Sequence, residues 1–210
     1  KYTVNKVSLK EKGASTLEAE DYWFDEATHR LSKTERGTYL GKFSGDDKIL
    51  TITTKGFYKL YTYDVLNHFD EDIILIEKQY PNLILTCIYF DGQSKCYFTK
   101  RFEPEANNNK TLIISEHEQS YIELVTTQIN PMIEIKFSKE KGKEIPDETL
   151  KMIEFSPIVN MKAKGKKLTS YKVKEINLRV SGEIVMDEVF GKVADENLEM
   201  VGEFFKKIKN

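Results

Sequence analysis

Short runs that alternate apolar and polar residues dominate the chain. Three pairs of such runs flank turn residues: 49–54 and 57–63 around Lys55-Gly56, 85–90 and 95–102 around Asp91-Gly92, and 121–127 and 132–137 around Asn130-Pro131. β-branched and aromatic residues suit a pleated strand, and Gly, Asn, Asp and Pro suit the connections between strands. Each pair therefore predicts a β-hairpin.

A fourth hairpin is predicted at 159–163 and 168–173 around Lys164-Gly165, which spaces the four turn centres 36, 38 and 35 residues apart. Single apolar runs at 72–78, 111–116 and 152–156 lie between the hairpins and predict linking strands. A hairpin plus a linking strand at near-constant spacing indicates a blade-like β repeat. The alternative is a meander or sandwich whose even spacing is a coincidence.

The two ends of the chain differ from this repeat. An aromatic strand is predicted at 22–26, and 139–149 is typical of an exposed loop. Near the C-terminus the period changes to that of a helix, at about 195–208, with Asp195 as its N-cap and an apolar face made by Leu198, Val201, Phe204, Phe205 and Ile208. A helix this short is marginal alone, so we expect it to dock on something.

Composition places the chain among soluble globular proteins. It has 210 residues, 40% hydrophobic and 31% charged, which suits one large domain or two small ones. The longest apolar runs, such as 73–76, are too short to span a bilayer, and we expect no signal peptide because no basic-then-apolar segment is found at the start of the sequence. We read Cys87 and Cys96 as reduced residues of strands; a disulfide or a metal pair is the alternative.

Residue patterns that carry catalysis are missing. The sequence at 37–42, GTYLGK, is one residue short of a phosphate loop and lacks its hydroxyl. His29, His68 and His117 are isolated from metal-ligand spacing, and the acidic run at 70–72 fits a solvated turn better than a cation loop. We therefore expect no catalytic residue, no metal and no cofactor in this chain.

Charge is segregated along the sequence. The net charge of −2 argues against a partner rich in phosphate, because nucleic-acid binding needs a basic surface. However, residues 159–179 hold seven basic residues and one acidic residue, a net charge of +6, so the remainder carries −8.

The motif K-x-K-G occurs three times, at 10–13, 139–142 and 162–165. Glycine allows a tight turn, and lysine is a flexible point charge that suits phosphates but reads base edges poorly. Only four of the 32 basic residues are arginine. The pattern favours contact with a phosphate backbone without sequence preference; a solvated turn is the alternative for any single copy.

Five stretches resemble the C-terminal region of topoisomerase IV and gyrase A subunits from one bacterial branch: KVSLKEKGAST (6–16), YWFDE (22–26), RGTYLGKFSGDDKIL (36–50), IYFDGQSKCYFTKRF (88–102) and KAKGKKLTSYKVKEI (162–176). They occur in the family's order and cover about residues 1–177. The resemblance implies an all-β fold, a β-pinwheel of four-stranded blades with DNA on a basic outer edge. It implies a partial ring of about three to four blades over 1–180, followed by a tail at 181–210 with the short helix.

The implied function is to bind and bend duplex DNA and present it to the cleavage core for strand passage. The residues expected to contact the phosphate backbone are Lys10, Lys12, Lys100, Arg101, Lys162, Lys164, Lys166 and Lys167. The implied partners are DNA, the rest of the A subunit and the B subunit, with no membrane, in the bacterial cytoplasm at the nucleoid. The parent enzyme would use ATP and magnesium elsewhere.

Two departures from the family bear on this expectation. Gyrase carries a box rich in arginine and glycine, and the nearest match, LKEKGAST at 9–16, lacks the Gly-Gly pair and carries Glu11, which favours the topoisomerase IV type. The Arg-Tyr pair that marks the cleavage tyrosine does not occur. The first competing hypothesis is a propeller-like interaction module that binds proteins and has no role on DNA, and the second is a β-rich enzyme whose site the sequence does not reveal.

Overall fold

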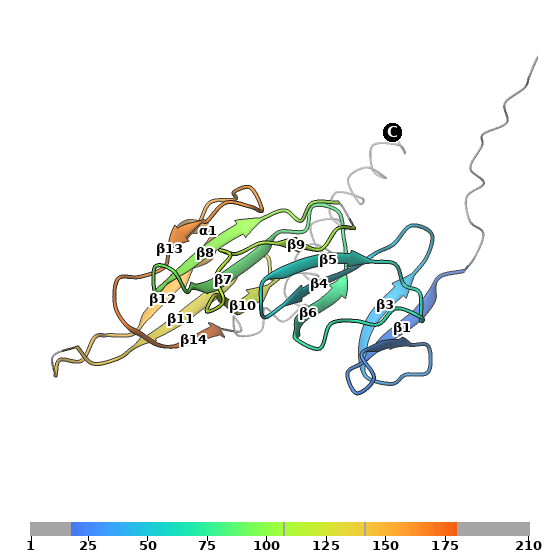
Figure 1. Cartoon of the computed structure of the whole chain (residues 1–210), viewed down its shortest axis with the longest axis horizontal. Helices are drawn as coiled ribbons and strands as arrows, with labels where there is room; N and C mark the ends of the chain where they lie inside the picture. Colours follow the sequence, from blue (N-terminus) through green and yellow to red (C-terminus); the bar gives the residue numbers. More distant parts are fainter. Residues whose placement is uncertain (1–17, 107, 141, 180–210) are drawn as a thin grey trace, which may run out of the picture. The chain divides into compact units, whose positions relative to one another are not determined.

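The computed structural model describes residues 18–106, 108–140 and 142–179 (Figure 1). The chain divides into two compact units: one contains the residues up to Thr127 together with Ile158–Leu168, and the other contains Gln128–Pro157 and the residues from Thr169 onward. Throughout the described residues the strands pair antiparallel in small sheets, and the single helix is one turn long. The all-β fold class is confirmed, and small antiparallel sheets of this kind are consistent with a β-pinwheel.

The first sheet of the first unit has the order β2-β1-β3. Its strands are β1 (Glu20–Asp25), β2 (Arg30–Ser32) and β3 (Thr38–Phe43), so the aromatic strand predicted at 22–26 is confirmed. Side chains alternate along β1, which buries Tyr22 and Phe24 against an aromatic core that includes Phe43 and Phe69.

The second sheet has the order β6-β4-β5-β9. Its strands are β4 (Ile49–Thr53), β5 (Phe57–Tyr61), β6 (Ile73–Lys78) and β9 (Thr111–Leu112). The hairpin at Lys55-Gly56 is confirmed, and β6 confirms the linking strand at 72–78. Gly56 has φ +83°, and a Cβ there would lie 2.4 Å from the Ile114 side chain, so only glycine fits this turn.

The third sheet has the order β10-β7-β8-β13. Its strands are β7 (Leu85–Asp91), β8 (Cys96–Phe102), β10 (Tyr121–Thr126) and β13 (Lys166–Lys167). The hairpin at Asp91-Gly92 is confirmed. Cys87 pairs with Lys100 and Cys96 with Asp91, so the cysteines do not face each other, and both are free thiols. Burial raises the pKa of Cys87 to about 12, which makes this thiol inert.

The second unit corrects two predictions. Its sheet, in the order β12-β11-β14, consists of β11 (Met132–Phe137), β12 (Glu148–Lys151) and β14 (Val173–Arg179). The hairpin at Asn130-Pro131 is wrong, because β10 pairs with β7 while β11 pairs with β12 and β14. The strand predicted at 152–156 is instead the helix α1 (Met152–Phe155), which follows directly after β12.

Sheets of the first unit are completed by segments from farther along the chain. The hairpin β4–β5 receives β9, which comes after β8, and the hairpin β7–β8 receives β13, which comes after β12. The segment that contains Phe69 bonds to the first sheet in the same way, because the Phe69 N–H donates to the His29 carbonyl at 3.0 Å. We call these pieces returning segments. They replace the fourth hairpin predicted around Lys164-Gly165, which does not form.

Each returning segment inserts one apolar side chain into the core. Phe69, Ile113 and Leu168 are buried, and their N–H groups donate to His29, Gly56 and Tyr97 respectively. Burying such a side chain stabilises a fold by about 1.5–3 kcal/mol. The segments therefore hold successive repeats together by both packing and backbone pairing. The helix predicted at 195–208 lies outside the described residues.

Candidate nucleic-acid interface

The basic loop, residues 160–168, lies within the last returning segment of the first unit. Its four lysines, Lys162, Lys164, Lys166 and Lys167, are all exposed, as the sequence predicted. Gly165 sits among them with φ +85°, and a Cβ there would lie 2.3 Å from the Thr99 carbonyl oxygen. Glycine is thus what allows the loop to lie flat against β8.

Both ends of the basic loop are fixed to the third sheet. The Val159 N–H donates to the Arg101 carbonyl at 2.8 Å, and the Leu168 N–H donates to the Tyr97 carbonyl at 2.9 Å. Between them, β13 pairs with β8, and Met161 is buried in the core. The exposed lysines are therefore presented by a segment with a defined path.

Lys100 is a correction to the predicted DNA-binding set. It is fully buried, and its Nζ donates to the carbonyls of Ile113, Met161 and Ala163, the last at 3.0 Å. Three carbonyls match the three donors of an ammonium group. Burial lowers the pKa of Lys100 to about 8. Lys100 therefore binds two returning segments from inside the protein and cannot reach a phosphate.

Arg101 is also a correction, because it too is buried, at 8% exposure. Lys10 and Lys12 lie outside the described residues. Of the predicted set, the structure thus brings Lys162, Lys164, Lys166 and Lys167 together on one exposed loop, whereas it buries Lys100 and Arg101.

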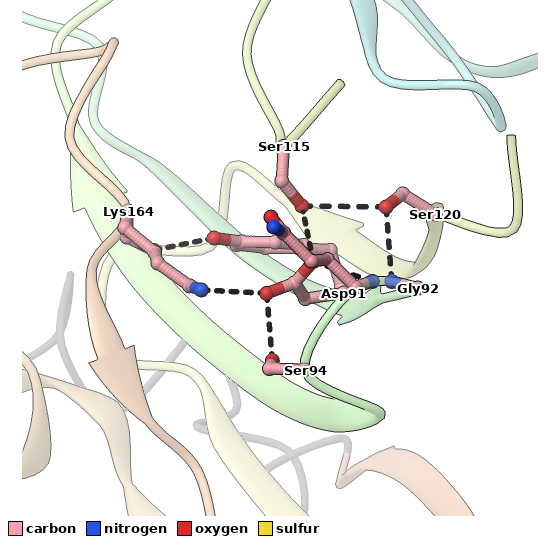
Figure 2. A network of polar contacts seen from close by, with 8 residues as sticks. Asp91, Gly92, Ser94, Ser115, Ser120 and Lys164 are labelled. Atoms are coloured by element: carbon pink, nitrogen blue, oxygen red, sulfur yellow. Dashed lines mark hydrogen bonds and ion pairs between the residues drawn. The ribbon is translucent and has the colours of Figure 1, made fainter. Parts of the chain in front are cut away.

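Lys164 differs from its neighbours because it is paired with a buried carboxylate (Figure 2). Its Nζ lies 2.6 Å from Oδ2 of Asp91, a residue with no exposed surface, and 4.4 Å from the centre of the Phe98 ring. Its backbone carbonyl accepts a hydrogen bond from the Tyr89 hydroxyl at 2.6 Å. Both the side chain and the backbone of Lys164 are thus attached to the hairpin β7–β8.

Asp91 receives several further hydrogen bonds. Ser94 Oγ donates to Oδ2 at 2.7 Å, and Ser115 Oγ and the Gln93 N–H donate to Oδ1 at 2.8 and 3.1 Å. Burial, the largest single influence, raises the pKa of Asp91, but the bonds from Lys164, Ser94, Ser115 and Gln93 together hold it well below its ordinary value. The carboxylate therefore stays ionised at neutral pH.

Comparison with known proteins places this arrangement in a family. The model of the topoisomerase C-terminal domain of Bacteroidota matches residues 30–180, well over half of the chain. The chain belongs to this family. The resemblance inferred from the sequence, to the C-terminal domain of a type IIA topoisomerase A subunit, is confirmed.

Among solved structures, the topoisomerase domain is similar to the crystal structure of the C-terminal domain of DNA topoisomerase IV. The two share 15% identity and a TM-score of 0.47, over 79% of this chain and 63% of that one. The chain thus spans less than two thirds of that structure's length. No curated protein matches the chain.

Another basic loop of the topoisomerase domain lies in the second unit, between β11 and β12. Lys139 there forms an ion pair with Glu144 at 2.7 Å, and the backbones of Glu140 and Lys143 bond to each other. Acidic residues within this loop partly neutralise it, which makes it a matched control for the basic loop at 160–168.

Sequence reasoning missed the role of Asp91, which it treated only as a turn residue. A signal was present: Asp followed three residues later by Ser is typical of a turn whose carboxylate accepts local hydrogen bonds. The sequence also did not single out Lys95, which is exposed at the tip of the same hairpin. Lys95 has φ +54°, and its backbone N–H donates to the Asp91 carbonyl.

Two kinds of feature are absent from the part of the topoisomerase domain that the structure describes. It contains no group of three or more His, Cys, Asp or Glu side chains placed to hold a metal ion. It also contains no helix with the length and apolar character needed to cross a membrane.

Proposed function

We propose that this topoisomerase domain binds duplex DNA through its phosphate backbone and uses the basic loop at 160–168 as a principal contact surface. The observation that carries the proposal is the exposure of Lys162, Lys166 and Lys167 on a segment fixed to the third sheet at both ends. Lys10 and Lys12 remain proposed contacts, whereas Lys100, Arg101 and Lys164 are not part of the proposed surface.

The residue type supports binding without sequence preference. Lysine reaches phosphate oxygens as a point charge, while reading of bases relies on the planar, bidentate groups of Arg, Asn and Gln. The three lysines lie within six residues of one another, on a segment that is fixed at both ends.

The role that follows is to hold a DNA segment for a catalytic core elsewhere in the parent topoisomerase, by bending it and presenting it for strand passage. We propose a parent of the topoisomerase IV type, with gyrase as the alternative, acting in the bacterial cytoplasm with ATP and magnesium bound outside this domain. The remainder of the A subunit and the B subunit would be its protein partners.

A titration of duplex DNA at several salt concentrations tests the proposal. Each phosphate neutralised by a lysine contributes about −0.9 to the slope of log K against log salt. Changing Lys162, Lys166 and Lys167 to Ala should weaken binding about equally for all duplex sequences and make the slope shallower by roughly one unit per lost contact.

The matched control is the change of Lys139 and Lys143 to Ala, which should alter affinity and slope less because Glu144 already pairs with Lys139. An unchanged slope in the folded triple variant would remove the basic loop from the DNA surface. Strong preference for one duplex sequence would contradict backbone recognition.

One observation favours a second function, the binding of another protein. Tyr39 is 53% exposed, packs at 5.2 Å from the centre of the Trp23 ring, and donates its hydroxyl to Asp21 at 2.6 Å. Exposed aromatic residues are common at protein interfaces. A gel shift with duplex DNA at low salt separates the two functions, because a domain that only binds proteins would give no shift.

A further inference from the structure

Lys164 lies within the basic loop, yet its surroundings set it apart from Lys162, Lys166 and Lys167. Its ammonium is held at 2.6 Å from the Asp91 carboxylate (Figure 2) and also lies over the Phe98 ring. A phosphate that took this ammonium would leave a buried carboxylate without its counter-charge. Although the Lys164 side chain is half exposed, removing the partner of a buried carboxylate is unfavourable.

Asp91 connects three separate segments of the first unit. Ser94 and Gln93 belong to its own turn, Ser115 follows β9 on the preceding returning segment, and Lys164 lies on the last one. Ser120, which precedes β10, accepts a hydrogen bond from the Gly92 N–H at 3.0 Å and extends the network. The carboxylate thus sets where the basic loop lies relative to the tip of the hairpin β7–β8.

We propose that Asp91 is a positioning residue of the DNA-binding surface, which withdraws Lys164 from phosphate contact and fixes the basic loop so that Lys162, Lys166 and Lys167 face the DNA backbone. This inference rests on the proposed function. It divides the four lysines, which the sequence presents as equivalent, into one that is paired with Asp91 and three that contact DNA.

The proposal predicts that the effect of Lys164 on DNA binding depends on Asp91. With Asp91 ionised, Lys164 releases no counterion on binding DNA, so Lys164→Met should leave the salt slope unchanged. In Asp91→Asn the amide oxygen still accepts hydrogen bonds from the turn, but the charge is gone. Lys164 then becomes available, and the slope should steepen by about one unit.

The experiment measures salt slopes on one duplex for the full chain and for Lys164→Met, Asp91→Asn and the double variant. The double variant should return to the slope of the unmodified chain, because the lysine that Asp91→Asn releases is missing. Ser94→Ala removes a hydrogen bond to Asp91 without changing charge, and it should leave the slope unchanged. Amide hydrogen exchange of residues 160–168 should become faster in Asp91→Asn. A loop whose position does not depend on the Asp91–Lys164 ion pair would show no such change.

A purely structural role for Asp91 would give a different pattern. It would lower stability in Asp91→Asn without steepening the slope, and that result in a folded variant overturns the proposal. If Asp91→Asn does not fold, Lys164→Met decides alone, since a slope shallower by one unit would mean that Lys164 contacts DNA. Lys166→Ala and Lys167→Ala in the same series report on the proposed function itself, because each should make the slope shallower whether or not the Asp91 inference holds.

Discussion

Two buried charges at the residue scale determine where the basic loop lies. Lys100 binds three carbonyls from inside the sheet, and Asp91 binds Lys164 at its edge. Buried ionised groups are tolerated when hydrogen bonds satisfy them, and removing one partner leaves the other uncompensated. Both residues should therefore tolerate substitution poorly, for different reasons.

Replacing Lys100 with Met should lower the free energy of unfolding by about 3 kcal/mol or more, because the apolar stem is kept while three carbonyls lose their donor, each at a cost of about 1–3 kcal/mol. Urea denaturation followed by circular dichroism measures the change. Lys162→Met is the control and should stay within about ±0.5 kcal/mol, since Lys162 is exposed. A Lys100 variant as stable as the control would show that the ammonium is dispensable.

Stability should depend on Asp91 in the acid range. Its pKa in the folded state lies below the unfolded value of about 3.9, so its contribution is present above that pH and is lost as the pH falls toward the folded pKa. The difference in unfolding free energy between the unmodified chain and Asp91→Asn should shrink from pH 5 to pH 2. Denaturant midpoints across that range test the sign, and a difference that widens in acid would refute it.

At the scale of elements, the sequence predicted strand pairing correctly where the two strands are adjacent along the chain. The hairpins at Lys55-Gly56 and Asp91-Gly92 join adjacent strands through short turns, so their patterns were sufficient. The runs around Asn130-Pro131 and Lys164-Gly165 pair with distant strands, and a turn signal does not reveal a distant partner. The stretch at 152–156 has the pattern of a strand but forms one helical turn. It follows directly after β12, and this tertiary context outweighs the local preference for a strand.

The prediction that Lys100 contacts DNA was wrong, and the alternation of residues along β8 already indicated this. Alternation along β8 places Lys100 on the same face as Phe98 and Phe102, which point into the core. A lysine between two inward aromatic residues should have been read as buried. Its partners could not have been found this way, since Met161 and Ala163 come from a returning segment some sixty residues later.

The fit of the basic loop against β8 gives a prediction for Gly165. Gly165→Ala adds a Cβ 2.3 Å from a backbone oxygen in a left-handed conformation, so it should destabilise the domain by more than about 1 kcal/mol. Gly45 has φ +57° with nothing within 4 Å of a Cβ, so Gly45→Ala isolates the cost of the backbone conformation. Equal losses in thermal melts of the two variants would show that the contact with Thr99 is relieved easily.

For the molecule as a whole, the placement of charge reconciles the proposed DNA binding with a net charge of −2. Net positive charge concentrates in 159–179, where the basic loop exposes Lys162, Lys166 and Lys167, whereas Glu144 pairs with Lys139 in the loop after β11. Weak overall repulsion from DNA is then compatible with a local phosphate-binding surface, since charges more than about 10 Å away are largely screened at moderate salt.

The isolated chain should neither cleave nor relax plasmid DNA, with or without ATP and magnesium, because its sequence lacks the Arg-Tyr pair and a complete phosphate loop. Agarose gels of supercoiled plasmid, incubated with excess protein and run after protease treatment, test this. Nicking that disappears when a residue of this chain is substituted would contradict it. Nicking that persists in every variant would indicate a contaminant.

The returning segments also have a consequence for synthesis on the ribosome. Strand β8 ends at Phe102, but the strand that covers its edge begins at Lys166. At about 5–20 residues per second, that edge waits roughly 3–13 s for its neighbour to be made. During this interval Asp91 is without Lys164 and Lys100 without two of its carbonyls. A nascent chain that stalls before residue 158 would present an unfinished sheet edge to chaperones, and completion of the last returning segment would be the event that ends its exposure.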